Sequence, residues 1–100
     1  MRQSVRKTNR VTLGEAIETF LQQFKLKEGI HEVRIQNNWE LWMGKTIARY
    51  TREISLRKKT LFIRVDSSAL KQELLFMREK IIKRVNDECK EEVIREVVIQ

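Results

Sequence analysis

The strongest constraint on the fold is a strand-to-helix transition within residues 60–88. Leu61, Ile63 and Val65 recur at every second position, which is typical of a half-buried strand. The run 66–68 then offers side-chain oxygens that suit a helix start. We therefore expect a helix over 69–88 that packs on the strand through one apolar stripe, namely Leu70, Leu74, Met77, Ile81 and Val85.

Phe76 falls on the opposite side of this helix, among Gln72, Lys80 and Lys83, where the pattern predicts only polar residues. Two interpretations remain open. The N-terminal part of the chain covers Phe76, or Phe76 is an exposed anchor for a partner. These four residues are the candidate protein-partner site.

Length and composition predict one domain without enzymatic chemistry. One hundred residues suffice for a single modest core, and the balance of 41% apolar to 35% charged residues is globular. Cys89 and His31 are the only residues of their kinds, so no disulfide or closed Cys/His zinc site is expected from one chain. No catalytic residue, nucleotide-binding loop or cofactor is predicted. No apolar run is long enough to span a membrane, and we expect a cytoplasmic protein.

The net charge of +7 is unevenly distributed. Residues 1–10 carry four bases and no acid, and residues 45–64 carry seven bases against Glu53 alone. Residues 86–100 are acidic instead. A basic side suggests nucleic acid as partner, although a merely solvated face is the alternative. The predicted nucleic-acid-binding residues are Lys45, Arg49, Arg52, Arg57, Lys58, Lys59, Phe62 and Arg64.

The N-terminal half is predicted to be a basic arm followed by two helices. Residues 1–11 lack an apolar period and should be a flexible arm. Thr12 and Glu15 form a capping box that starts a helix, and Gly29 should end it. The stripe of this helix is Leu13, Ile17, Phe20, Leu21 and Phe24.

A second helix is expected over 30–43, with apolar residues on two sides. Trp39 and Trp42 on one side could stack bases, but aromatic pairs at helical spacing are more often core. Both sides are expected to pack, the other being Ile30, Val33 and Leu41. Gly44 should end this helix, and residues 45–50 should form a short helical turn.

A hairpin should join a strand around Ile54 and Leu56 to the strand at 60–65. Pairing Leu56 with Leu61 and Ile54 with Ile63 puts all four side chains on one face. Because no Gly or Asn is available for a two-residue turn, a four-residue loop around Lys58-Lys59 is favoured. The other face then carries Ser55, Arg57, Phe62 and Arg64, with Glu53 opposite Arg64. There Phe62 could stack a base while arginines meet phosphates, or could simply be exposed.

A last strand over 93–100 should place Val97 and Ile99 inward, parallel to the preceding strand. The expected architecture is thus α+β, one domain over 12–100 in the order α-α-β-β-α-β. It has a three-stranded mixed sheet with helices on one face.

The chain resembles the DciA-like family of bacterial replicative-helicase loaders, long catalogued as a domain of unknown function. The resemblance spans residues 13–100 and rests on two spaced motifs, with Asn86 and the terminal VVIQ strand completing the pattern. The first motif is W-x4-G-x2-IA, in Trp39, Gly44, Ile47 and Ala48. The second is L-x-I-x-V-x-SS-x4-EL, in Leu61, Ile63, Val65, Ser67, Ser68, Glu73 and Leu74.

This resemblance implies a K-homology-like fold and an adaptor that helps load the replicative DNA helicase onto single-stranded or forked DNA. The alternative is a general RNA- or DNA-binding module without a helicase role. The sequence departs from the family pattern at Leu70, in a hairpin without glycine, and in having no extension after the last strand. A G-x-x-G loop is also missing, so the phosphate clamp of K-homology domains does not carry over.

Overall fold

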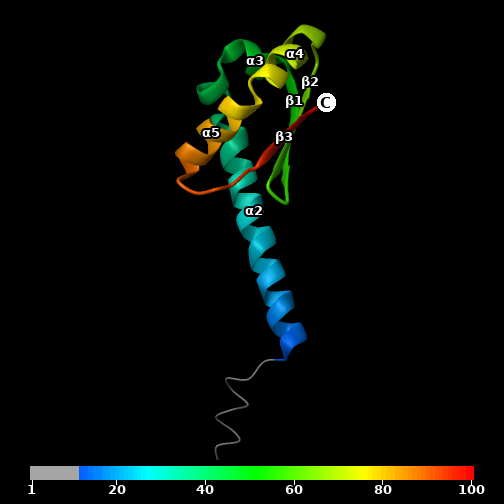
Figure 1. Ribbon diagram of the computed structural model, residues 1–100, viewed down its shortest axis with the longest axis vertical. Coiled ribbons are helices and arrows are strands. Elements are labelled where there is room, and N and C mark those ends of the chain that lie inside the picture. The colour runs from blue at the N-terminus through cyan, green and yellow to red at the C-terminus, as the bar shows by residue number, and fades with distance from the viewer. Residues whose placement is uncertain (1–11) are drawn as a thin grey trace, which may run out of the picture.

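The computed structural model describes residues 12–100, and the predicted basic arm lies outside them. The architecture is α+β with a three-stranded mixed sheet, as predicted from the sequence (Figure 1). Its elements are α2 (Leu13–Met43), α3 (Lys45–Tyr50), β1 (Thr51–Arg57), β2 (Thr60–Val65), α4 (Ser68–Phe76), α5 (Arg78–Cys89) and β3 (Glu96–Ile99).

The sheet has the order β1-β2-β3, with β1 antiparallel and β3 parallel to β2. The predicted register is confirmed, since Leu56 pairs with Leu61 and Ile54 with Ile63. Helices α2, α4 and α5 cover the inner face of the sheet, and the core lies between these two layers (Figure 1). Its fully buried residues are Ile35, Leu61, Ile63, Leu74, Ile81, Val85 and Ile94.

The first two predicted helices are one continuous helix, so the expected end at Gly29 is wrong. A glycine inside a helix costs only about 1 kcal/mol relative to alanine, which packing readily offsets. The helical period continues unbroken through Gly29, because Phe24 and Ile35 fall on the same side of α2. At the start of the helix the predicted capping box is confirmed, with Thr12 Oγ1 accepting from the Glu15 N–H at 3.0 Å.

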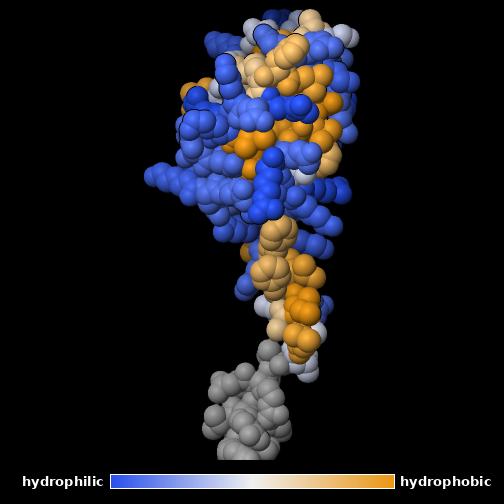
Figure 2. Space-filling view, viewed as in Figure 1, coloured by the Kyte–Doolittle hydropathy of each residue, from blue (hydrophilic) through white to orange (hydrophobic). Residues whose placement is uncertain are grey.

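Only the C-terminal half of α2 packs on the body of the domain. Ile35 and Trp39 are buried there, so the core interpretation of Trp39 is confirmed. The segment 13–24, which we call the overhang, stands away from the sheet (Figure 1) and shows an apolar stripe (Figure 2). The second apolar side of the helix, at Ile30, Val33 and Leu41, is exposed rather than packed.

The hairpin closes with a two-residue turn, and the predicted four-residue loop is wrong. Arg57 pairs directly with Thr60, and Lys58 and Lys59 both adopt positive φ, at 48° and 64°. Lysine pays a steric cost in this conformation, which contacts from elsewhere in the chain offset. The Lys58 N–H donates to Glu28 Oε2 at 2.7 Å, and the Lys59 carbonyl accepts from the Arg95 N–H at 2.7 Å.

The long helix after β2 is broken in two at Met77. Ser67 caps α4, as the predicted helix start requires, by accepting from the Leu70 N–H at 3.3 Å. The inward stripe is confirmed, with Leu74, Ile81 and Val85 buried, and Leu70 and Met77 half-buried at its edge. The helical structure continues to Cys89, and β3 is shorter than the predicted strand because it begins only at Glu96.

Candidate nucleic-acid interface

The outer face of the sheet is open and carries the predicted aromatic-and-arginine pattern. Ser55 pairs with Phe62 across β1 and β2, and Glu53 pairs with Arg64. On the other side of Phe62 lies Val98 of β3, which the parallel register places next to it. A shallow hollow of about 240 Å³ on this face is lined by Glu53, Ser55, Arg57, Phe62, Arg64 and Gln100.

Within this face, the two arginines differ in their availability. The Arg64 Nε lies 3.2 Å from Glu53 Oε1 and forms an exposed ion pair. Arg57 makes no ion pair with any residue of 12–100. Arg57 is therefore free to meet a phosphate, whereas Arg64 must first give up a weak contact.

The turn lysines lie at the tip of the hairpin, at one end of the face. Lys59 Nζ is 3.2 Å from Glu92 Oε1, and Arg95 Nε is 2.9 Å from the same oxygen. These two contacts, the Arg95 hydrogen bond first, hold the pKa of the Glu92 carboxyl below its usual range. Lys58 points its ammonium group to no carboxylate of the described chain. Lys58 is thus the free cation of the pair.

The remaining three predicted cations lie at the opposite end of β1. Lys45 and Arg49 belong to α3, whereas Arg52 lies near the start of β1. Arg52 is committed to the fold, because its Nη2 is 3.1 Å from Asp66 Oδ2, and the Asp66 N–H donates to the Tyr50 carbonyl at 2.8 Å. The seven residues of β1 span about 23 Å, so the eight predicted residues do not form one patch.

The sequence therefore predicted the central face, and it predicted the third strand, but the outward residues of that strand were not included in the site. Val98 and Gln100 border Phe62 and the hollow, yet neither was among the predicted site residues. These two residues could have been predicted from the alternation along the last strand. If Val97 and Ile99 point inward, then Val98 and Gln100 must point outward, onto the face that carries Phe62.

The acidic C-terminal stretch does not form a separate negative pole. Besides Glu92, Glu91 is engaged, with its carboxylate 3.0 Å from Lys27 Nζ. The Lys27 hydrogen bond is the main reason that the pKa of Glu91 lies below its usual range. His31 Nε2 lies 3.1 Å from the other Glu91 oxygen, but the contact does not meet the geometry of a hydrogen bond.

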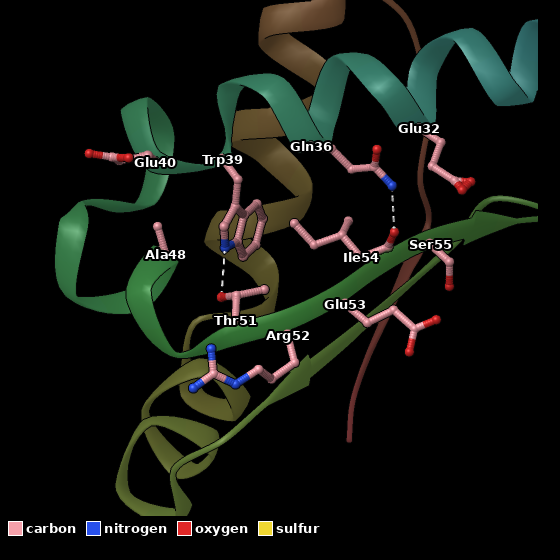
Figure 3. Close-up of a pocket in the computed structure, with 10 residues that line it drawn as sticks. All are labelled: Glu32, Gln36, Trp39, Glu40, Ala48, Thr51, Arg52, Glu53, Ile54 and Ser55. Carbon is pink, nitrogen blue, oxygen red and sulfur yellow. Dashed lines mark hydrogen bonds between the residues drawn. The ribbon is translucent and has the colours of Figure 1, made fainter.

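A hollow of about 550 Å³ lies between α2 and the free edge of β1 (Figure 3). Trp39 Nε1 donates to Thr51 Oγ1 at 3.0 Å, and Gln36 Nε2 donates to the Ile54 carbonyl at 2.8 Å. These bonds fasten the helix to the strand. The rim carries three carboxylates and one guanidinium, which disfavours a nucleic-acid backbone there.

The predicted protein-partner residues lie on both sides of the helix break. Phe76 is 87% exposed, so no described residue covers it. Gln72 precedes it on α4, whereas Lys80 and Lys83 belong to α5. Lys83 Nζ is paired with Asp87 at 3.0 Å. The break at Met77 means that these four residues do not share one straight helix face.

Two features of residues 12–100 bear on metal and thiol chemistry. No cluster of three or more His, Cys, Asp or Glu in this part of the chain is placed to hold a metal ion. Cys89 is buried, and burial raises the pKa of its thiol, which disfavours the reactive thiolate. No helix in this part of the chain has the length and apolar content that crossing a bilayer requires.

Comparison with known proteins identifies the family. The family model described as "Dna[CI] antecedent, DciA" matches residues 12–99. No curated protein matches the chain. The family match covers nearly the whole chain and nearly the same residues as the resemblance noted from the two motifs, and the chain therefore belongs to the DciA family.

Proposed function

We propose that this protein is a non-enzymatic adaptor that binds single-stranded or forked DNA and assists the replicative DNA helicase. The observation that supports DNA binding is the open sheet face, where Phe62 lies between Arg57 and Arg64. Arg57 has no ion pair within residues 12–100, and a phosphate can replace Glu53 in the exposed ion pair of Arg64. An aromatic ring can stack any base, and the flanking cations can meet phosphates. Such contacts carry no sequence preference. The helicase role is inferred from the DciA family.

The two kinds of contact predict separable effects on DNA affinity. If about five phosphates are neutralised, log K for single strands should fall with log salt at a slope of roughly −3.5. Arg57→Glu should weaken binding about tenfold and make this slope shallower. Phe62→Ala should cost about 1 kcal/mol or more and leave the slope unchanged, because stacking releases no counterions. Fluorescence anisotropy with a labelled oligonucleotide, at several salt concentrations, measures both quantities.

Lys71→Glu is the matched control, since it makes the same change in net charge on α4 and Lys71 is exposed. It should reduce affinity much less than Arg57→Glu. Equal losses would mean that the protein responds only to overall charge. Salt-independent binding would exclude the basic face.

Helicase assistance without nucleotide chemistry requires differential binding. The protein must hold one helicase conformation more tightly than another, because equal affinity for both shifts nothing. We propose Phe76 as the anchor of this contact, because its ring is 87% exposed and aromatic side chains are enriched in protein–protein interfaces. Gln72 on α4, with Lys80 and Lys83 on α5, is the proposed polar surround of this anchor.

Phe76→Ala should therefore weaken helicase binding by about 2 kcal/mol or more while DNA affinity and the melting temperature stay nearly unchanged. Isothermal titration with the purified helicase measures the first, and anisotropy and thermal melting measure the others. Leu41→Ala is the control, because Leu41 is similarly exposed on α2. Unchanged helicase affinity in the Phe76 variant would refute this anchor. A complex that disappears with nuclease treatment would support a general nucleic-acid-binding module instead.

A further inference from the structure

The overhang of α2 presents an apolar stripe that is exposed along its length, except at half-buried Phe24, where the overhang meets the body of the domain. Leu13 is 77% exposed and Phe20 is 64% exposed, and Ile17 and Leu21 between them are also exposed. The rings of Phe20 and Phe24 stack with centroids 6.4 Å apart, which keeps the stripe continuous. Figure 2 shows it as an unbroken apolar surface along the projecting helix. A stripe of this length at helical spacing is suited to pack on another helix.

We propose that a second copy of this chain covers the stripe, with the two overhangs packed antiparallel. The reason for this direction is that the stripe lies on the same side of α2 as Ile35 and Trp39, which the body of the domain covers. Parallel helices with facing stripes would force both bodies into the same space. In an antiparallel pair, the two bodies lie at opposite ends of the contact, each next to the N-terminal end of the partner helix.

Charges on the overhang and directly after it fit the same direction. Glu18 and Lys25 lie two turns apart on one flank of the stripe, and neither makes an ion pair within the described residues. An antiparallel two-fold pair brings equal flanks together, so Glu18 faces the partner's Lys25 and Lys25 faces the partner's Glu18. A parallel pair would bring Lys25 toward the other flank, which carries Lys27.

This pairing also places an apolar residue at a hollow. When Glu18 lies opposite the partner's Lys25, the partner's Leu13 lies beside residues 27–31. A hollow of about 180 Å³ opens there, lined by the apolar residues Phe24, Leu56 and Val93 together with six charged or polar residues, namely Lys27, Glu28, His31, Lys59, Glu91 and Glu92. The partner's leucine can enter it, which extends the helix contact onto the body of the domain.

The size of the contact sets the expected affinity. The twelve helical residues of the overhang form a contact about 18 Å long. Such a contact should bury less surface than the roughly 800 Å² per partner of a standard interface. The dimer should therefore dissociate in the micromolar range. Sedimentation equilibrium of the full chain at about 5–500 μM should show a monomer–dimer equilibrium.

Charge reversal tests the direction of packing. Glu18→Lys and Lys25→Glu should each raise the dissociation constant by about fivefold or more, because each breaks two symmetric pairs and creates like-charge contacts. The double variant should restore the parental constant, since the pairs re-form with signs exchanged. Failure of the double variant to recover would overturn the antiparallel arrangement.

Phe20→Glu should abolish the dimer, and it should fold normally because Phe20 contacts no part of the core. The matched control is Val33→Glu, on the exposed opposite side of α2, which should leave the equilibrium unchanged. A chain that stays monomeric up to 500 μM would refute the proposal. If the parental chain is monomeric and Phe20→Glu removes its helicase binding, the proposal is also refuted, and the stripe is assigned to the helicase.

Discussion

Truncation of Ile63 or Leu74 to alanine is expected to lower the free energy of unfolding by about 2–5 kcal/mol. Both side chains are completely buried, Ile63 on the inner face of β2 and Leu74 on α4. Deleting their methyl groups removes apolar contact and leaves a cavity that a close-packed core cannot fill. Urea unfolding, followed by the fluorescence of the buried Trp39, gives the change from the shift in midpoint.

The control for this pair is Leu26→Ala, which removes the same atoms as Leu74→Ala from an exposed position on α2. It should change stability by less than about 0.5 kcal/mol. Losses below about 1 kcal/mol at both Ile63 and Leu74 would show that the inward face of the sheet or of α4 is wrongly assigned.

Asn86→Ala should destabilise the fold by about 3 kcal/mol, although it removes only a small polar side chain. Asn86 Oδ1 accepts from the N–H groups of Val93 and Ile94 at 2.8 and 3.0 Å. Its Nδ2 donates to the Ile94 carbonyl at 2.9 Å. Val93 and Ile94 are themselves buried, so the variant leaves three backbone groups without partners in a place that water reaches poorly.

Asn86→Asp separates the two halves of this interaction. The aspartate still accepts from both N–H groups, but its second oxygen cannot donate to the Ile94 carbonyl and faces it as one acceptor against another, so this variant should also be less stable than the parent. Hydrogen exchange should report the difference locally, with the Val93 and Ile94 amides losing protection only in the alanine variant. Equal stability of all three proteins would mean that these bonds contribute nothing net.

The period-two and helical patterns predicted the sheet register and the inward stripe correctly, because both depend on burial of one face. Leu56 can pair with Leu61 only in a register that also buries Ile63. The helix end at Gly29 was wrong because a local preference of about 1 kcal/mol was given more weight than the helical period, which continues through Gly29 to Ile35 and Trp39. The turn was wrong for a different reason, since Glu28 and Arg95, which hold it, lie far away in the sequence.

The candidate site was predictable in its centre and not at its edges. Alternation along β1 and β2 placed Arg57, Phe62 and Arg64 on one face, and the structure confirms that they line one hollow. Charge counting could not show that Arg52 is engaged with Asp66, or that Lys59 is engaged with Glu92. Ion pairs between distant segments depend on the finished fold, so composition alone overestimates the number of cations available to a ligand.

The position of Gly29 gives α2 an uneven resistance to unwinding. Gly29 follows Glu28, whose carboxylate accepts from the Lys58 N–H of the hairpin turn. A β-carbon at Gly29 would meet no heavy atom within 4 Å apart from the backbone of its own helix and its chain neighbours. Unwinding that starts at Thr12 can therefore run to this glycine without disturbing the core, whereas beyond it Ile35 and Trp39 must leave their packing. Helix α2 is thus one continuous helix in the structure, but it should unwind as two segments, one on each side of Gly29.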